Sequence, residues 1–296
     1  MNQKPVKSGV LFAIAAYVMW GLAPMYFKAL NEMAAPEIMM HRVFWSVPVL
    51  FILLLARRKL GQVIVAILAP KILKTLLVSG LLLAVNWLVF IWAINNDRLL
   101  ESSLGYFINP LINVALARVF LGEKLTRLQG VAVAVVFIGV VNVLVAYGEL
   151  PWVSLVLAGT FSCYGLLRKK VAVESMPGLF IESLFMFPFA VAYWIVVQPE
   201  HSNLITNDIE LNSLLVLAGV ITTVPLLCFT AAARRIRYTT LGFFQYIGPS
   251  IMFVLAVGVY GEPIDSTKIF TFICVWAALI IYVYDLLRVY KQAPKV

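Results

Sequence analysis

The chain is poor in charged residues, which limits the kind of protein it can be. Only 12% of its 296 residues are Asp, Glu, Lys or Arg, against about 25% in an average soluble domain. Hydrophobic residues make up 62% of the chain, and the mean hydropathy is +0.96. A soluble core cannot bury that much apolar surface. The composition therefore indicates an integral membrane protein that crosses the bilayer several times.

Residues that commonly carry out chemistry are also scarce. There are two histidines, His41 and His201, and three cysteines, all within apolar segments and without CxxC spacing. Cysteines in such positions usually serve as small buried apolar residues. Two histidines are too few for a metal site. Motifs for a serine nucleophile, a zinc protease or a nucleotide-binding P-loop are absent. The sequence predicts no metal, no cofactor and no enzymatic activity.

Long apolar runs fill most of the chain. A helix needs about 20 mostly apolar residues to cross a hydrocarbon core of about 30 Å, and in lipid its backbone groups must be hydrogen-bonded internally. The first run is longer than the apolar part of a signal peptide and predicts an uncleaved span. We expect an all-α membrane protein with ten transmembrane helices, at 8–28, 36–56, 74–94, 99–119, 128–147, 151–169, 178–197, 212–232, 238–259 and 268–288.

Basic residues alternate between the predicted loops. Nineteen of the 23 Lys and Arg residues fall at one set of span ends, including Arg57–Lys59 and Arg168–Lys170. Loops rich in Lys and Arg stay on the cytoplasmic side, so both termini are predicted to be cytoplasmic. The formal net charge of +9 is then explained by orientation and by anionic lipid, without a nucleic-acid partner.

An internal repeat is visible when the segment "YFINPLINVALARVFLGEKLT" (106–126) is laid over "QYIGPSIMFVLAVGVYGEPID" (245–265). Pro110 then meets Pro249, and each proline is followed at equal spacing by Gly-Glu, read as a helix stop. Five spans in each repeat, 8–147 and 151–288, would place the repeats in opposite orientations across the membrane. Inverted repeats are typical of secondary carriers. A duplication retained only for folding is the alternative.

Four segments also resemble a known family: "MWGLAPMYFK" (19–28), "EIMMHRVFWS" (37–46), "LLAVNWLVFIWAIN" (82–95) and "SLGYFINPL" (103–111). They are similar to the RarD branch of the EamA family, in the drug/metabolite transporter superfamily, and the likeness covers nearly the whole chain. The resemblance implies a permease of the bacterial inner membrane, often an exporter of amino acids, metabolites or drugs. The branch is named for an association with chloramphenicol sensitivity.

The same resemblance implies that spans 1–4 and 6–9 surround a central cavity and that spans 5 and 10 are peripheral. Pairing of the peripheral spans would give a homodimer. The expected partners are a small-molecule substrate and the lipid bilayer.

Two charged residues lie inside apolar runs. Arg42 is about 9 Å into its span, where an unpaired charge costs from about 2.5 kcal/mol upward. We expect it to face a vestibule and position anionic groups; snorkelling to the interface is the alternative. Glu182 occupies the matching position of the second repeat, near the opposite face. The depth gap of roughly 15 Å argues against a salt bridge between the two.

Glu182 and His41 are the candidates for proton coupling, because each could titrate during a transport cycle. Alternatively, Glu182 forms a local ion pair that holds helices together. His41 lies about 100° around its helix from Arg42, and Glu37, one turn earlier, could pair with it. A structural role is the alternative for His41.

Polar and aromatic residues gather at mid-depth. With Arg42 and Glu182 they form the predicted substrate-binding or translocation residues: Trp20, Asn86, Trp87, Tyr106, Asn109, Tyr164, Gln245 and Tyr246. Helix kinks are expected at Pro110, Pro225 and Pro249. An amphipathic aromatic pocket suits a small organic solute. The alternative is that the amides bridge helices and the rings fill space.

The sequence thus predicts a secondary transporter that exports a small metabolite or drug by alternating access. No enzyme motif is present to suggest otherwise. A membrane scaffold or channel without carrier activity is the alternative.

Overall fold

Helices account for all regular structure in the described part of the chain. The computed structural model describes residues 3–96, 98–148, 151–259, 261 and 266–292. A short 3₁₀ helix, Glu200–Ser202, lies between α8 and α9. The α-helices are α1 Gln3–Lys28, α2 Ala35–Ala56, α3 Leu60–Leu68, α4 Pro70–Asn95, α5 Leu99–Leu121, α6 Arg127–Tyr147, α7 Trp152–Lys170, α8 Ser175–Val197, α9 Ile209–Arg235, α10 Tyr238–Phe244, α11 Ile247–Gly258 and α12 Ser266–Gln292.

Nine stretches within the described residues are long and apolar enough to cross a membrane, compared with the ten spans expected. The difference is α7, which is not among the nine. It ends in the three basic residues Arg168–Lys170 and contains Ser, Thr and Tyr within its length, so its apolarity is low. The apolar-run argument also did not predict α3, which is only nine residues long.

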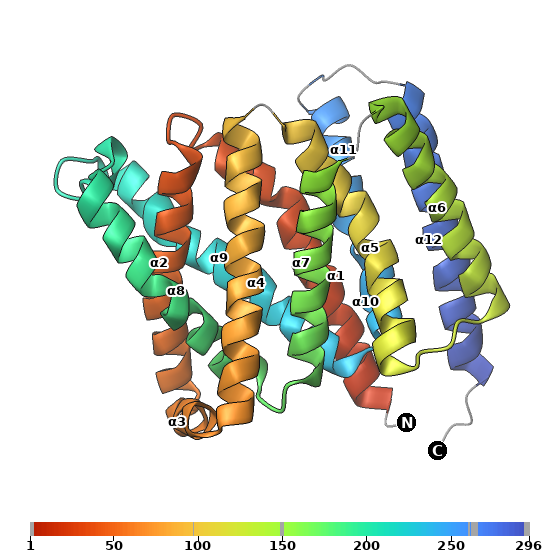
Figure 1. Ribbon diagram of the computed structural model, residues 1–296, viewed down its shortest axis with the longest axis horizontal. Helices are drawn as coiled ribbons and strands as arrows, with labels where there is room; N and C mark the ends of the chain where they lie inside the picture. Colours follow the sequence, from red (N-terminus) through yellow and green to blue (C-terminus); the bar gives the residue numbers. More distant parts are fainter. Residues whose placement is uncertain (1–2, 97, 149–150, 260, 262–265, 293–296) are drawn as a thin grey trace.

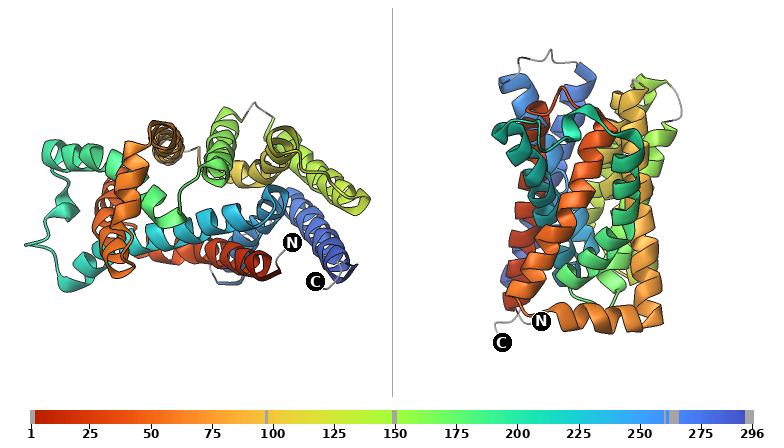
Figure 2. Two further views of the ribbon diagram at one scale, coloured as in Figure 1. Left: turned by 90° about the horizontal axis from the view of Figure 1, so that it is seen from below. Right: turned by 90° about the vertical axis from the view of Figure 1, so that its left-hand side faces the viewer.

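Consecutive long helices run in opposite directions (Figure 1). The first turn of α1 and the last turn of α12 lie at the same end of the molecule as α3. The α6–α12 pair packs together at one edge of the molecule (Figures 1 and 2). The remaining helices form the main body, in which α1 packs on α9 and α11, α7 packs on α4 and α5, and α2 packs on α8 and α9.

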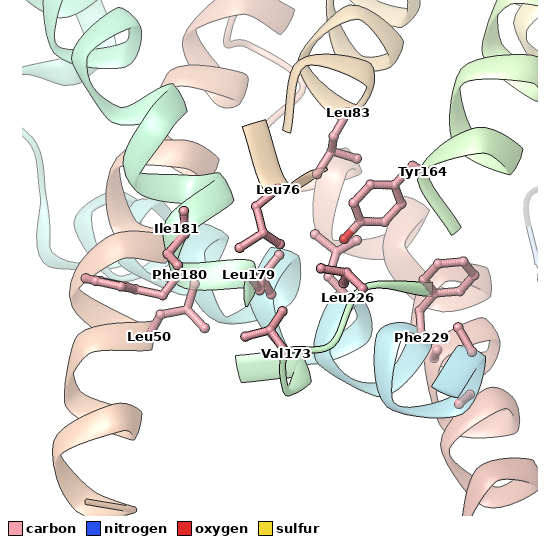
Figure 3. Close-up of a cluster of buried hydrophobic side chains, with 14 of the residues drawn as sticks. Leu50, Leu76, Leu83, Tyr164, Val173, Leu179, Phe180, Ile181, Leu226 and Phe229 are labelled. Carbon is pink, nitrogen blue, oxygen red and sulfur yellow. The ribbon is translucent and has the colours of Figure 1, made fainter. Parts of the chain in front are cut away.

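The main apolar core lies where α2, α4, α7, α8 and α9 meet (Figure 3). Leu50, Leu76, Tyr164, Leu179 and Phe229 are each at most 1% exposed. They come from five different helices, so the core joins segments from both halves of the chain.

The expected span 238–259 is interrupted. Gln245 and Tyr246 separate α10 from α11, and the break lies one turn before Pro249. Proline lacks an N–H and its ring crowds the carbonyl four residues earlier, here that of Gln245, which accounts for the break. By contrast, α5 and α9 are continuous helices through Pro110 and Pro225.

One expected helix stop is visible in detail. Gly122 caps α5 in the left-handed region, with φ of 63°, which favours glycine. Gly261 has a similar φ of 66°. Glu262 and Pro263, the rest of the second expected stop, lie outside the described residues.

Candidate functional site

Arg42 lies at the crossing of α2 and α9, among aromatic rings. Its Nε donates a hydrogen bond of 2.9 Å to Thr222 Oγ1. Its guanidinium lies over the rings of Trp87 and Phe27, 5.1 and 5.5 Å from their centroids. Aromatic faces stabilise a cation electrostatically. Three helices besides its own, α1, α4 and α9, therefore hold this side chain in place.

Tyr106 brings a fourth neighbouring helix, α5, to the same place. Its phenol lies within electrostatic range of Arg42. The residue is 39% exposed. Arg42 and Trp87 are partly exposed as well, so the structure brings Arg42, Trp87 and Tyr106 to one accessible site.

Trp20 and Tyr164 belong to an adjoining aromatic cluster. The Trp20 ring lies 5.7 Å from that of Phe161 and 5.8 Å from that of Phe229. Tyr164 is fully buried and stacks on Phe229 with an interplanar angle of 14°. The rings of α1, α7 and α9 thus form a continuous wall, in which Trp20 remains half-buried.

The predicted amides bridge helices. Asn86 Nδ2 donates to the Leu157 carbonyl and to Thr160 Oγ1, at 2.8 and 3.0 Å. Asn109 Nδ2 donates to the Ala158 carbonyl at 2.8 Å. These bonds join α4 and α5 to α7.

A second amide contact joins α5 to the break between α10 and α11. Asn113 Nδ2 donates to both Asn109 Oδ1 and Gln245 Oε1, each at 3.1 Å. Tyr246 donates to the Phe107 carbonyl at 3.0 Å. Asn109, Gln245 and Tyr246 are at most 5% exposed, so in this state their polar atoms serve helix packing.

Glu182 lies in a separate, closed cluster. Its carboxylate is 3.6 Å from Arg168 Nη1, and both side chains are 0% exposed. Ser79 and Tyr164 donate hydrogen bonds to the same carboxylate, the latter at 3.3 Å. Arg168 also donates to the Ser175 carbonyl at 3.0 Å. Glu182 thus has a local cation, whereas among the described residues no contact joins it to Arg42.

His41 takes part in a polar chain near the start of α2. Its Nε2 is 2.9 Å from Ser202 Oγ, and Ser202 donates to Glu37 Oε1 at 2.6 Å. Because the serine proton goes to Glu37, the geometry requires His41 Nε2 to donate. Glu37 is also 3.6 Å from His201 Nδ1. Glu37 is thus linked to both histidines, directly to His201 and through Ser202 to His41.

Several residues of these clusters were not anticipated. Arg168 was counted among the loop charges because it precedes Lys169 and Lys170, yet its side chain is fully buried. Thr222, Phe161 and Phe229 are ordinary residues of apolar helices, and nothing in their spacing marks them. The internal repeat relates the position of Arg42 to that of Glu182, but it does not predict which residues contact either side chain.

Two surface grooves lie away from this site. One, of about 420 Å³, is lined mainly by apolar residues of α4 together with Phe185 of α8. The other lies beside Ile209 and Val216 at the start of α9. Neither contains a predicted site residue. The candidate site is therefore defined by the accessible side chains around Arg42, and the first groove faces outward where lipid would lie.

Comparison with known proteins finds relatives along the whole chain. Residues 7–145 match the model of the EamA-like transporter family. The chain is 51% identical to an uncharacterized transporter of Vibrio cholerae, over 97% of this chain and 95% of that protein. It is 46% identical to Protein RarD of Escherichia coli over the full length of both. A chloramphenicol-sensitive protein RarD of Pseudomonas aeruginosa is 31% identical over 97% of each chain.

A solved crystal structure shares the fold, with a TM-score of 0.73 and 15% identity over 93% of this chain and 96% of that one. The family and its relatives' names indicate a membrane transporter rather than an enzyme, which implies a small-molecule substrate and a lipid bilayer around the protein. Together with the apolar helices, these likenesses show that the chain is a RarD-like permease of the EamA-like transporter family, in the bacterial inner membrane.

Proposed function

We propose that this protein is a secondary transporter that exports a small organic metabolite or drug by alternating access. The observation that carries the proposal is an asymmetry between two charged sites. Arg42 and Tyr106 are accessible, whereas Arg168 and Glu182 are fully buried. A carrier that is open on one side and closed on the other would show this difference in one of its end states.

The proposed translocation path includes the predicted residues Trp20, Arg42, Asn86, Trp87, Tyr106, Asn109, Tyr164, Glu182, Gln245 and Tyr246. Its walls come from α1, α2, α4, α5 and α7 to α11. Rearrangement of the amide contacts between α5, α7 and the α10–α11 break would open or close the path, and Pro110, Pro225 and Pro249 provide places where helices can bend.

Ten spans in two inverted repeats, 8–147 and 151–288, are part of the proposal. α1 packs on α9 and α11, and at the corresponding positions of the other repeat α7 packs on α4 and α5. This exchange supports a pseudo-twofold relation in which α7, the sixth predicted span, completes the set of ten. Both termini would be cytoplasmic by the distribution of Lys and Arg. The peripheral α6 and α12 would provide the surface of a homodimer, which cross-linking in membranes can detect.

The test is counterflow in liposomes. Purified protein would be reconstituted, preloaded with one unlabelled solute, and offered labelled amino acids, nucleosides, organic acids or chloramphenicol. Chloramphenicol belongs in the panel because of the name of the 31% identical relative. Saturable uptake that requires preloading establishes a carrier. Passive, non-saturable flux would support a channel instead, and no flux from folded protein would support a scaffold.

Glu182 and His41 are the proposed proton-coupling residues. Glu182→Gln should abolish the response of transport to an imposed pH gradient while leaving exchange at equal pH. Transport by Glu182→Gln that equals wild type at every pH would leave Glu182 with the structural role of an ion-pair partner for Arg168. The matched test at His41 is His41→Gln, which keeps a donor toward Ser202.

A further inference from the structure

We propose that Arg42 binds the anionic oxygen group of a small organic substrate, so that the solutes carried by this protein bear a carboxylate, sulfonate or phosphate. The part that concerns transported solutes rests on the proposed function. The binding site itself does not.

Arg42 lacks a counter-ion. No carboxylate of the described residues forms an ion pair with it. The buried or largely buried acids are engaged elsewhere: Glu37 with Ser202, Glu182 with Arg168, Glu123 with the start of α10, and Asp285 with Gln129. An unpaired cation within an apolar helix is energetically costly, and a bound anionic ligand would reduce that cost.

Most of the hydrogen-bonding capacity of Arg42 is also unused. A guanidinium has five N–H donors, and in the described structure only Nε is bonded, to Thr222. The two terminal amino groups are not among the buried unpaired atoms, unlike Nη1 and Nε of Arg168. They are therefore accessible. Among the described residues, Arg168 is buried against Glu182, whereas the terminal amino groups of Arg42 are accessible.

The surroundings fix the orientation of the open guanidinium. Trp87 and Phe27 hold it from the sides, and Thr222 holds Nε. A planar guanidinium fixed in this way can present two parallel N–H groups, the geometry that binds an oxyanion in two places at once. The Arg42 side chain is therefore ordered before the ligand binds, which lowers the entropy cost of binding.

Tyr106 supplies a further donor. Its hydroxyl has no hydrogen-bond partner among the described residues, and the residue is 39% exposed beside Arg42. A neutral ligand would leave the Arg42 charge uncompensated, and a cationic ligand would be repelled. An oxyanion satisfies both the guanidinium and the phenol.

The test measures binding in detergent, without transport. Thermal stability would be recorded with a panel of carboxylates, sulfonates and phosphate esters, each paired with its neutral amide or alcohol and its amine. Phenylacetate, phenylacetamide and phenylethylammonium form one such set. We expect at least one anion to raise the melting temperature while its neutral and cationic counterparts do not.

Four variants complete the test. Arg42→Gln should weaken anion binding about 10- to 100-fold, as expected for the loss of hydrogen bonds to a charged group. Arg42→Lys should retain part of the binding, since it keeps the charge without the fork. Tyr106→Phe removes only a hydroxyl from an exposed ring and should weaken binding by about three- to tenfold. Arg118→Gln, at an exposed position of α5, should bind like wild type.

The inference is overturned if no anion in the panel gives a shift, if neutral counterparts bind as well as anions, or if Arg42→Gln binds anions like wild type. Counterflow separates this from the proposed function. Saturable exchange of neutral or cationic solutes only would keep the transporter and refute the anion site, whereas anion binding without any exchange would keep the site and refute transport.

Discussion

Gly178 makes the buried ion pair possible. A Cβ at this position would overlap the guanidinium of Arg168. The absence of a side chain on α8 therefore creates the space in which Arg168 reaches Glu182 and the Ser175 carbonyl. A pair buried in this way is costly to desolvate, and removal of one partner leaves the other charge unpaired.

Gly178→Ala is expected to lower stability by about 3–5 kcal/mol, because it displaces Arg168 from Glu182 and leaves a buried charge without its partner. The measurement is the melting temperature, or a denaturant titration, of protein in detergent. Gly159→Ala in α7 is the matched control, since nothing lies within 4 Å of its new Cβ. Equal stability of the two variants would show that Arg168 relaxes without loss.

The side chain of Glu123, in the loop after α5, caps the N-terminus of α10. Its Oε1 accepts a 2.7 Å hydrogen bond from the Tyr238 amide, and its Oε2 accepts one of 3.0 Å from the Thr239 amide. Free amides at a helix start favour an anionic acceptor. The loop after α5 thereby caps α10, a helix of only seven residues, whose own N-terminal flank provides no side-chain cap.

Glu123→Ala should destabilise the protein by about 1–2 kcal/mol, the usual cost of a lost cap, and should loosen α10 in particular. Hydrogen exchange of the α10 amides, followed by mass spectrometry, measures the local effect. The neighbouring Lys124→Ala serves as control, because Lys124 contacts Arg237 through its backbone carbonyl, which alanine keeps. Unchanged exchange in α10 of Glu123→Ala would contradict the capping role.

The short helix α3 is attached to the start of α8 by Glu174. Lys59 and Gln62 both donate hydrogen bonds to this carboxylate, the latter at 3.0 Å. The bond from Lys59, followed by that from Gln62, lowers the pKa of Glu174 below its ordinary value. The side chain of Lys59 is 33% exposed and that of Glu174 is 48% exposed, so solvent screens this ion pair.

A lowered pKa in the folded protein means that the contribution of Glu174 is present above the ordinary carboxyl pKa and is lost as pH falls through the lowered pKa. Glu174→Gln should therefore lower the melting temperature slightly near neutral pH, by a free energy of no more than about 1 kcal/mol. The difference from wild type should disappear in acid. A difference that grows as pH falls would have the wrong sign.

The two ends of the molecule differ in their basic residues. The connections α2–α3, α5–α6, α7–α8 and α9–α10 lie at the end that carries α3 (Figure 1). Together with the helix ends beside them, these connections hold 12 of the 23 Lys and Arg residues. The loop between α8 and α9 lies at the other end and carries Glu200 and Asp208. The positive-inside tendency then predicts which end is cytoplasmic.

Thiol labelling in intact cells measures this orientation. In a background with Cys163, Cys228 and Cys274 replaced by serine, Ile205→Cys should react with a membrane-impermeant maleimide, because Ile205 is 95% exposed in the α8–α9 loop. Lys124→Cys should react only after the membrane is permeabilised. The reverse pattern would invert the proposed topology.

The sequence by itself determined the membrane class, the positions of most helices and the family resemblance. A bilayer requires long apolar segments whose backbone groups are hydrogen-bonded internally, and such segments can be recognised from the sequence alone. The apolar pattern of the sequence is weaker at α7. This helix packs against other helices and carries polar and basic residues, which lower its mean hydropathy.

Only the tertiary structure decided how the polar groups are paired. Arg168 reaches Glu182 because Gly178 leaves room. Glu123 caps a helix more than one hundred residues away. Arg42 stays open because the buried acids of the described chain are paired elsewhere. Each of these outcomes depends on how closely two distant helices approach. That distance is set by packing of the whole bundle, which no local pattern of residues encodes.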